Sequence, residues 1–382
     1  MRADFGPDLV LSATIVFLLC ALVLRGVVGL RWALVLAFVR VALPVLNFGG
    51  LGPLDAGMVD DLAYTSKARG MLAAGIGPLR VLTDPDCSLV LFTAAGGRHV
   101  GYLFMNLVAQ TLFGPHYWSA VLVNVFLSCL AARGLHRLVR IQGADRRHAG
   151  GLAFFFLLHW DVLAWSSFFN LKDTLVLTLS VWTLAWMTQV AVSRRLGSMA
   201  MAAGCMLLTV FVRWYVPVIL LGAFAVFGIL QLRGRARVLL LGLCAGGLLL
   251  LLQRGLGLEY LVPSTFATGL VRFPLTPVPW QIDDDYSFLL FPAVLHWFFL
   301  PIAGIGALRL WRRSPLARLV LIYLVVIVAF YALVPRLQGP RHRFQAAFGL
   351  ALCQFEGLTV LLGTTIARPR SIARGRGSGC AV

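Results

Sequence analysis

Long apolar runs recur along the chain, and they constrain its fold more than any other feature. The runs are roughly 16 to 22 residues long and are separated by short breaks that contain arginine, the length that a helix needs to cross the hydrocarbon core. Of the 382 residues 60% are hydrophobic and 13% are charged, which excludes an ordinary soluble domain. The short alternating segments of an outer-membrane barrel do not occur. The chain is therefore predicted to be an all-α polytopic membrane protein.

We expect a single transmembrane domain over residues 1–382, with about eleven spans of this length. The apolar runs that we assign to spans are 9–24, 32–47, 118–133, 150–165, 173–192, 198–213, 216–232, 238–253, 286–306, 319–335 and 345–364. The stretch 101–113 is short for a crossing and ends at Gly114 and Pro115. We interpret it as an interfacial or re-entrant helix, and whether it crosses the membrane is left open.

The distribution of charge predicts how the protein is oriented. Its formal net charge is +18, and most arginines stand in breaks that contain almost no acid. Such loops face the cytoplasm under the positive-inside rule, so the charge indicates membrane orientation and not a nucleic-acid partner. The acids lie mainly in the alternate loops. We therefore place 48–117, with short interfacial helices, and 254–285 outside, and the basic tail 366–382 in the cytoplasm.

The segment 59–75, VDDLAYTSKARGMLAAG, is an acid-led polar stretch inside the first long external loop. In a helix, Asp60, Tyr64 and Lys67 would share one face, because they are spaced by four and three residues. An acid, a phenol and an ammonium on one face suit an active site. The alternative is a solvated helix start, where acids are favoured by the helix dipole.

Ionisable residues from distant parts of the chain converge on the same predicted external side. Charge near a bilayer is costly, so such residues tend to line a water-filled cavity or a ligand site. The candidate site residues are Asp60, Asp61, Tyr64, Lys67, Asp161, Lys172, Asp173, Arg213, Arg341, His342 and Arg343.

Four segments in this order resemble one family. They are the Asp60–Asp61 stretch with Tyr64, Arg69 and Gly75, then LFGPHYWSAVLVN at 112–124, SSFFNLKDTLVL at 166–177 and PRHRFQAAFGLAL at 340–352. The chain resembles the polytopic GT-C glycosyltransferases, in particular those similar to protein mannosyltransferases and aminoarabinose transferases (glycosyltransferase family 39-like). The resemblance covers roughly residues 50–365 and departs from the family after Phe344, where no proline follows.

The resemblance implies a GT-C-like helix bundle and a transfer reaction on the external face of the plasma membrane. A polyprenyl-phosphate sugar would be the donor, and a hydroxyl of a glycan, lipid or protein the acceptor. Asp60 would act as the base, with Asp61 as its substitute or orienter. Arg341 and Arg343, and after them Lys172, would bind the lipid phosphate. The other candidates would bind substrate: Tyr64, Lys67, Asp161, Asp173, Arg213 and His342.

No cofactor is expected, although a divalent metal at the acid run 283–285 is left open beside a solvated loop edge. Arg341 and Arg343 have the alternative of interfacial anchors. Asp161 and the pair Lys172–Asp173 have the alternative that they only flank a turn and pair with each other. His159, His296 and Glu356 fall inside spans, where packed and hydrogen-bonded roles are expected.

Two rival functions are left open. One is a polymerase or ligase that joins lipid-linked glycans. The other is a transporter or flippase for a lipid-linked anionic substrate, which predicts charges through the bilayer depth and helix breaks near the midplane. The candidate residues cluster at one predicted face, and this favours surface chemistry.

Overall fold

The computed structural model of the chain describes residues 6–51, 59–97, 99–231, 234, 237 and 261–363. Within them the side chains of residues 51, 59, 60, 284 and 285 are not described. Every regular element in these ranges is a helix, as the apolar runs predict. The predicted span 238–253, the side chains of Asp284 and Asp285 and the basic tail lie outside this description.

Seven helices in the described ranges are long and apolar enough to cross a membrane. They are built on α1 (Pro7–Val28), α2 (Leu30–Leu46), α7 (Tyr117–Ile141), α10 (Asp173–Ser193), α15 (Leu290–Arg313), α16 (Arg318–Leu333) and α18 (Ala347–Leu361). An eighth span is formed if α8 (Arg146–Leu158) and α9 (Trp160–Phe168), bent by 54° at His159, count as one. The chain is thus a helical protein with multi-pass membrane character, and the total of about eleven spans stays a prediction.

The runs 198–213 and 216–232 also form helices, α11 (Leu196–Val212) and α12 (Tyr215–Gln231), each of 17 residues. Their loop at Arg213 and Trp214 is as tight as predicted. Helix α9 ends at Phe168 and α10 begins at Asp173, so the predicted short turn lies between these two helices. Two turns that carry candidate residues are therefore where the sequence places them.

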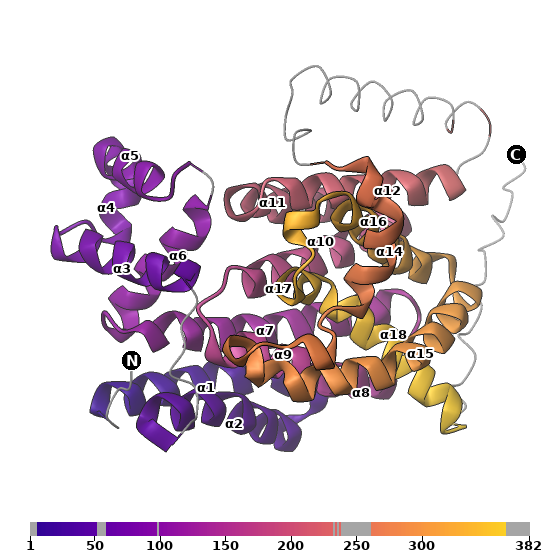
Figure 1. Cartoon of the computed structure of the whole chain (residues 1–382), viewed down its shortest axis with the longest axis horizontal. Coiled ribbons are helices and arrows are strands. Elements are labelled where there is room, and N and C mark those ends of the chain that lie inside the picture. The colour runs from indigo at the N-terminus through magenta and orange to yellow at the C-terminus, as the bar shows by residue number, and fades with distance from the viewer. Residues whose placement is uncertain are drawn as a thin grey trace, which may run out of the picture.

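In the described part of the predicted external loop 48–117, the α-helices are α3 (Val59–Ala73), α4 (Pro78–Thr83), α5 (Pro85–Ala94) and α6 (Val100–Phe113). The acid-led segment is helical, as expected. These helices gather at the end of the bundle where α1 begins (Figure 1). The second predicted external loop contributes α14 (Phe266–Leu275), which packs on α16.

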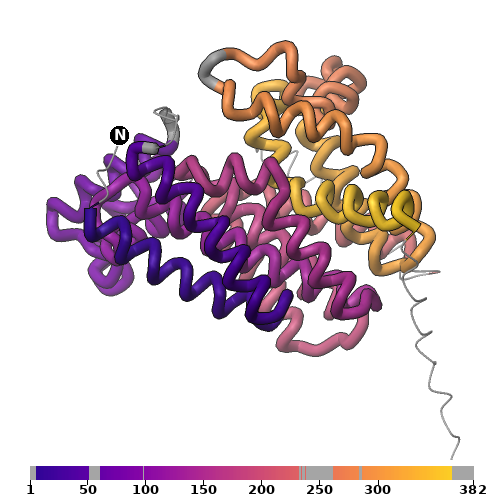
Figure 2. Tube along the Cα trace, turned by 90° about the horizontal axis from the view of Figure 1, so that it is seen from below, coloured from indigo at the N-terminus to yellow at the C-terminus, as the bar shows by residue number. Residues whose placement is uncertain are grey.

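The outer surface of the bundle is apolar where α1 and α2 lie side by side (Figure 2). Leu11 and Phe38 are 63% and 65% exposed. The opposite faces of the same helices are buried against α7 and α9. A helix that is apolar on its exposed and its buried face suits a bilayer and not water.

Helices α15 and α18 pack with their backbones close together. A Cβ atom on Gly306 would lie 1.8 Å from the Cys353 carbonyl oxygen, and one on Gly357 would lie 2.0 Å from the Ile302 carbonyl oxygen. Each helix thus presents a glycine to the backbone of the other, as in the small-residue contacts of membrane helices. This contact holds the helix that follows Arg341 and Arg343 against the bundle.

The contact predicts that Gly306→Ala destabilises the fold. The added methyl group forces α15 and α18 apart, at a cost of about 1 to 3 kcal/mol. Thermal unfolding in detergent should show a lower midpoint for this variant. Gly304→Ala is the matched control, since a Cβ atom there meets nothing within 4 Å. Equal midpoints for the two variants would contradict the close approach.

Candidate functional site

Asp61 fixes α3 to α7. The side chain is fully buried, and the Tyr117 hydroxyl donates a hydrogen bond of 2.6 Å to its Oδ2. Tyr117 comes at the start of α7, directly after the turn at Gly114 and Pro115. A buried carboxylate that accepts a short hydrogen bond is held in one orientation. In this structure Asp61 therefore positions the acid-led helix.

Asn170, in the turn between α9 and α10, joins α3 and α6 in a second set of contacts. Its Nδ2 donates to Thr65 Oγ1 at 2.9 Å and to Asn106 Oδ1 at 2.6 Å. Its Oδ1 accepts a hydrogen bond of 2.6 Å from the Tyr102 hydroxyl. All these side chains are buried, so each hydrogen bond replaces one that water would otherwise supply. The turn is thereby fixed against the helices of the first external loop.

Asp173, two residues after Leu171 at the end of the same turn, collects two arginines. Its Oδ1 lies 2.9 Å from Arg213 Nη2, and its Oδ2 lies 2.9 Å from Arg341 Nε. Gln345 Nε2 donates to Oδ1 at 2.6 Å. Arg213 is 3% exposed, whereas the Arg341 side chain is 18% exposed. One carboxylate therefore orients one buried and one accessible guanidinium.

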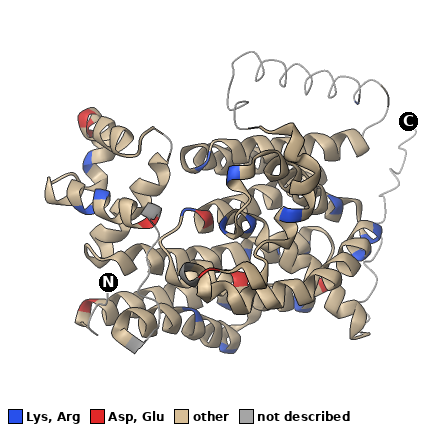
Figure 3. Cartoon of the chain, viewed as in Figure 1, with Lys and Arg blue, Asp and Glu red and all other residues tan. Residues whose placement is uncertain are grey.

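Arg343 pairs with a different carboxylate. Its Nη2 lies 2.8 Å and 2.9 Å from the two oxygens of Asp161, on α9. Arg343 and Asp161 are 2% and 1% exposed. Arg341 and Arg343 thus pair with Asp173 and Asp161, which stand at the two ends of the segment 161–173. Figure 3 shows blue and red residues side by side near α17 (Pro340–Arg343), on a fold that is mostly tan.

Lys172 lies at the junction of these contacts. Its Nζ is 3.0 Å from the Tyr64 hydroxyl and 5.2 Å from the centre of the Tyr64 ring. The Tyr64 ring meets those of Tyr102 and His99 edge to face. The predicted phenol and the predicted ammonium of the turn are therefore in contact, and this contact links α3 to the Asp173 cluster.

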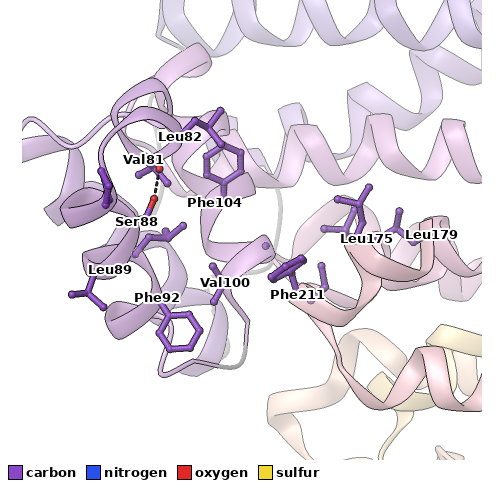
Figure 4. A pocket seen from close by; sticks show the side chains of 15 residues that line it. Val81, Leu82, Ser88, Leu89, Phe92, Val100, Phe104, Leu175, Leu179 and Phe211 are labelled. Atoms are coloured by element: carbon purple, nitrogen blue, oxygen red, sulfur yellow. Dashed lines mark hydrogen bonds between the residues drawn. The ribbon is translucent and has the colours of Figure 1, made fainter. Parts of the chain in front are cut away.

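An apolar groove of about 690 Å³ opens beside these charges. It lies between α4, α5 and α6 on one side and α10 and α11 on the other, with Phe104, Val100, Leu175 and Phe211 turned toward it (Figure 4). Val212 also lines the groove, and the next residue is Arg213. A ligand with an apolar chain and an anionic head could place the first in the groove and the second near the guanidiniums.

The identity of the protein must rest on this arrangement. Comparison with protein-family models, curated proteins and solved structures finds no match for the chain. The resemblance described from the sequence therefore stays a prediction, and the chemistry of the site carries the functional argument.

The structure brings most of the predicted site residues together in two linked clusters. One contains Asp61, Tyr64 and Lys172, and the other contains the paired acids and arginines: Asp161, Asp173, Arg213, Arg341 and Arg343. His342 lies half-buried between the two late arginines, and its ring is 5.5 Å from that of Tyr331. Asp161 and Asp173 pair with arginines from far along the chain, so the alternative that they only flank a turn is wrong.

Two predicted residues stand apart from these clusters. Lys67 is exposed, whereas Tyr64, three residues earlier on α3, is buried. The expectation that they point the same way is wrong, because neighbours at this spacing still differ by about 60° around a helix axis. The side chain of Asp60 lies outside the described residues. The described side chains contain no group of three His, Cys, Asp or Glu residues suited to a metal ion.

Sequence reasoning missed the neutral polar residues that complete the site. Tyr117, Asn170 and Gln345 contact its carboxylates or its turn, and Tyr331 donates to Gln345 Oε1 at 2.8 Å. Each stands beside or inside an apolar run, where an uncharged polar side chain must find a protein partner. The presence of such polar residues beside apolar runs can be seen in the sequence, but it does not specify the partner of each side chain.

Other buried polar contacts involve side chains of the predicted spans, and one of them adjoins the cluster, because the Asp161 backbone N–H donates to His159 Nδ1 at 3.2 Å. His159, at the break between α8 and α9, contacts Gln354 Oε1 at 2.9 Å, and Glu356 contacts His148 and Arg313 at 2.7 Å each. His296 Nε2 contacts the Pro274 carbonyl at 2.7 Å. The expected hydrogen-bonded roles of His159, His296 and Glu356 are confirmed.

Fully buried Arg40, on α2, donates to Ser128 at 2.9 Å and also contacts Ser166. Charged side chains outside the candidate set therefore also occur inside the bundle, where contacts that the linear sequence does not reveal can stabilise them. That the candidate residues share one external face stays a prediction.

Acid is expected to destabilise the fold through His99. Burial and the nearby Lys172 ammonium lower the pKa of His99 to about 4. The unfolded chain therefore binds the proton first as pH falls below about 6.5, and the folding stability falls between that pH and about 4.

Because His99 is partly exposed, solvent screening limits the loss to about 1 kcal/mol at pH 5. Thermal midpoints at pH 7 and pH 5 measure it. In His99→Gln the amide keeps a donor for the Val212 carbonyl, which His99 Nδ1 contacts at 2.8 Å. This variant should lose less stability on acidification than the wild type does. An equal loss would remove His99 as the cause.

Proposed function

We propose that the chain is a glycosyltransferase of the plasma membrane that moves a sugar from a polyprenyl-phosphate donor to an acceptor hydroxyl on the external face. The observation that supports this best is an apolar groove whose lining includes Val212, the residue before Arg213, and Leu175, two residues after Asp173. A polyprenyl chain is long, unbranched in outline and apolar, and its phosphate is an anion. The groove complements the apolar chain, and the cations complement the phosphate.

The proposed reaction is a single inverting displacement. The acceptor oxygen attacks the anomeric carbon while Asp60 takes its proton, and the bond from that carbon to the phosphate oxygen breaks. The electron pair of the broken bond leaves with the polyprenyl phosphate, whose negative charge increases. Cations that are already oriented stabilise this charge without reorganising, and no cofactor is needed.

Arg341 is the first choice for the phosphate, because its partly exposed guanidinium is oriented by Asp173. Lys172 is the second choice. It is far from Arg341 in the sequence, but it acts electrostatically on Asp173, the partner of Arg341. Arg343 is buried in its pair with Asp161. We assign it the task of holding α17 in place, so that a donor contacts Arg341 in this conformation.

The proposal is tested by transfer of a radiolabelled sugar from polyprenyl-phosphate donors in membranes that contain the protein. Arg341→Gln should reduce transfer at least tenfold, because a charge-assisted contact to the leaving phosphate contributes about 1.5 to 3 kcal/mol. The control is Arg272→Gln, an exposed arginine of α14, which should keep wild-type transfer. If the folded wild type transfers sugar from none of these donors, the proposed function is overturned.

A second candidate, a transporter or flippase for a lipid-linked anion, is favoured by one observation. The α8–α9 pair is broken by 54° at His159, and the residue just after the break region, Asp161, carries a buried ion pair. Broken helices with buried polar groups occur at the sites of transporters. Movement of a labelled donor across proteoliposomes without any transfer to an acceptor would support this candidate over the first.

A further inference from the structure

A second groove, of about 880 Å³, lies between α1, α7 and α10, away from the site described above. Its charged lining is wholly basic, with Arg25 from α1 and Arg133, Arg137 and Arg140 from α7. The groove follows the last turns of α1 and α7. The arginine distribution predicts that these ends face the cytoplasm.

The charges of this groove are not balanced by nearby acids. No carboxylate is among its lining residues, and none of the described acids forms an ion pair with its four arginines. His136 also lines it, and Arg140, Arg146 and Arg133 all act on that ring electrostatically. Like charges held together repel each other, so a bound anion would lower the energy of the folded state.

Part of the groove is rigid. The Arg137 guanidinium lies 3.8 Å from the centre of the Trp186 ring on α10, an arrangement that fixes its direction. Its Nε and the Nε2 of His136 are buried, and neither has a hydrogen-bond partner among the described residues. Because these two atoms are not accessible from the groove, a ligand would contact the lining arginines through their other nitrogens.

The rest of the lining is apolar. Leu22, Val23, Leu130 and Trp182 complete the walls, and a Cβ atom on Gly26 would meet nothing within 4 Å. The positive-inside rule accounts for arginines at the ends of both α1 and α7. It does not by itself explain why they gather over an open, partly apolar groove. A basic end and an apolar wall suit a lipid with an anionic head.

We infer that this groove binds the phosphate headgroup of an anionic phospholipid from the cytoplasmic leaflet. The headgroup would contact Arg25, Arg133 and Arg137, and an acyl chain would lie along Leu22 and Leu130. This inference concerns a different site from the proposed transferase centre and does not depend on it.

The test uses the full-length protein in detergent, with lipid binding followed by native mass spectrometry and by the thermal midpoint. Phosphatidylglycerol should bind and raise the midpoint, whereas phosphatidylcholine, which has no net charge, should bind at least tenfold more weakly. In Arg25→Gln/Arg133→Gln the preference should fall at least tenfold. Both residues are exposed, so the variant should still fold.

The control is Arg195→Gln/Arg312→Gln, which removes the same charge from two exposed arginines of other predicted cytoplasmic loops. It should keep the preference for phosphatidylglycerol. An equal loss in both double variants would mean a general effect of charge and would overturn the site. A third arm adds inorganic phosphate alone: stabilisation equal to that by phosphatidylglycerol would assign the groove to a soluble anion and overturn the lipid assignment.

Discussion

Replacing Asp60 with asparagine should reduce sugar transfer by at least about 100-fold, because positioned general bases contribute roughly 10² to 10⁴ to a rate. The amide keeps the size of the side chain but cannot accept the acceptor's proton. The assay is transfer from a polyprenyl-phosphate donor in membranes, normalised to the amount of folded protein. Wild-type transfer by Asp60→Asn would remove this residue from the mechanism.

Asp61→Asn separates the two neighbouring acids. Asp61 is buried and accepts from Tyr117, so its replacement weakens a hydrogen bond to a charged group worth about 1.5 to 3 kcal/mol. Its thermal midpoint should fall, and transfer per folded molecule should change much less than in Asp60→Asn. Asp283→Asn, an exposed acid in the second predicted external loop, controls for loss of one negative charge. It should match the wild type in both measurements.

The largest expected effect on stability belongs to Asp173→Asn. Asp173 is fully buried and is the shared partner of Arg213 and Arg341. Breaking a buried ion pair from one side costs about 3 to 5 kcal/mol, because the remaining charge is left uncompensated. For a chain of this size that corresponds to a fall in the thermal midpoint of roughly 5 °C.

A double variant tests whether the unpaired charge is the cause. Adding Arg341→Gln to Asp173→Asn removes one of the two guanidiniums that lost their partner. The double variant should therefore be more stable than Asp173→Asn alone, although less stable than the wild type. If the losses of stability in Asp173→Asn and in Arg341→Gln simply add in the double variant, the cost of replacing Asp173 arises from packing and not from the unpaired charge. Tyr331 and Gln345, which remain, hold the neutral part of the network in both variants.

The local turns of the site could be read from the sequence. The run SSFFNLKD predicts a short turn before α10, and the structure has α9 end at Phe168 and α10 begin at Asp173. PRHR likewise begins the last helical segment, at Pro340. Charged residues that interrupt apolar runs mark such turns, because a charge costs less near the end of a membrane helix than at its middle.

The partners inside the site could not be read in this way. Arg341 and Asp173 are 168 residues apart, and Arg343 and Asp161 are 182 residues apart. Nothing in the order of residues says which arginine faces which acid, since the pairing depends on how α10, α9 and α17 pack. The same holds for Tyr117 and Asp61, where a neutral phenol determines the position of an acid.

The sequence by itself determined that the chain is helical and suited to a membrane, because hydrophobicity and run length act locally along the chain. It also determined where the acid-led helix and the charged turns lie. Only the tertiary structure decided that Asp61 is buried, that Arg341 is accessible while Arg343 is not, and that charge extends into the bundle at Glu356 and Arg40. The physical reason is that the state of a charge depends on its distance from other charges and from water, and packing sets both.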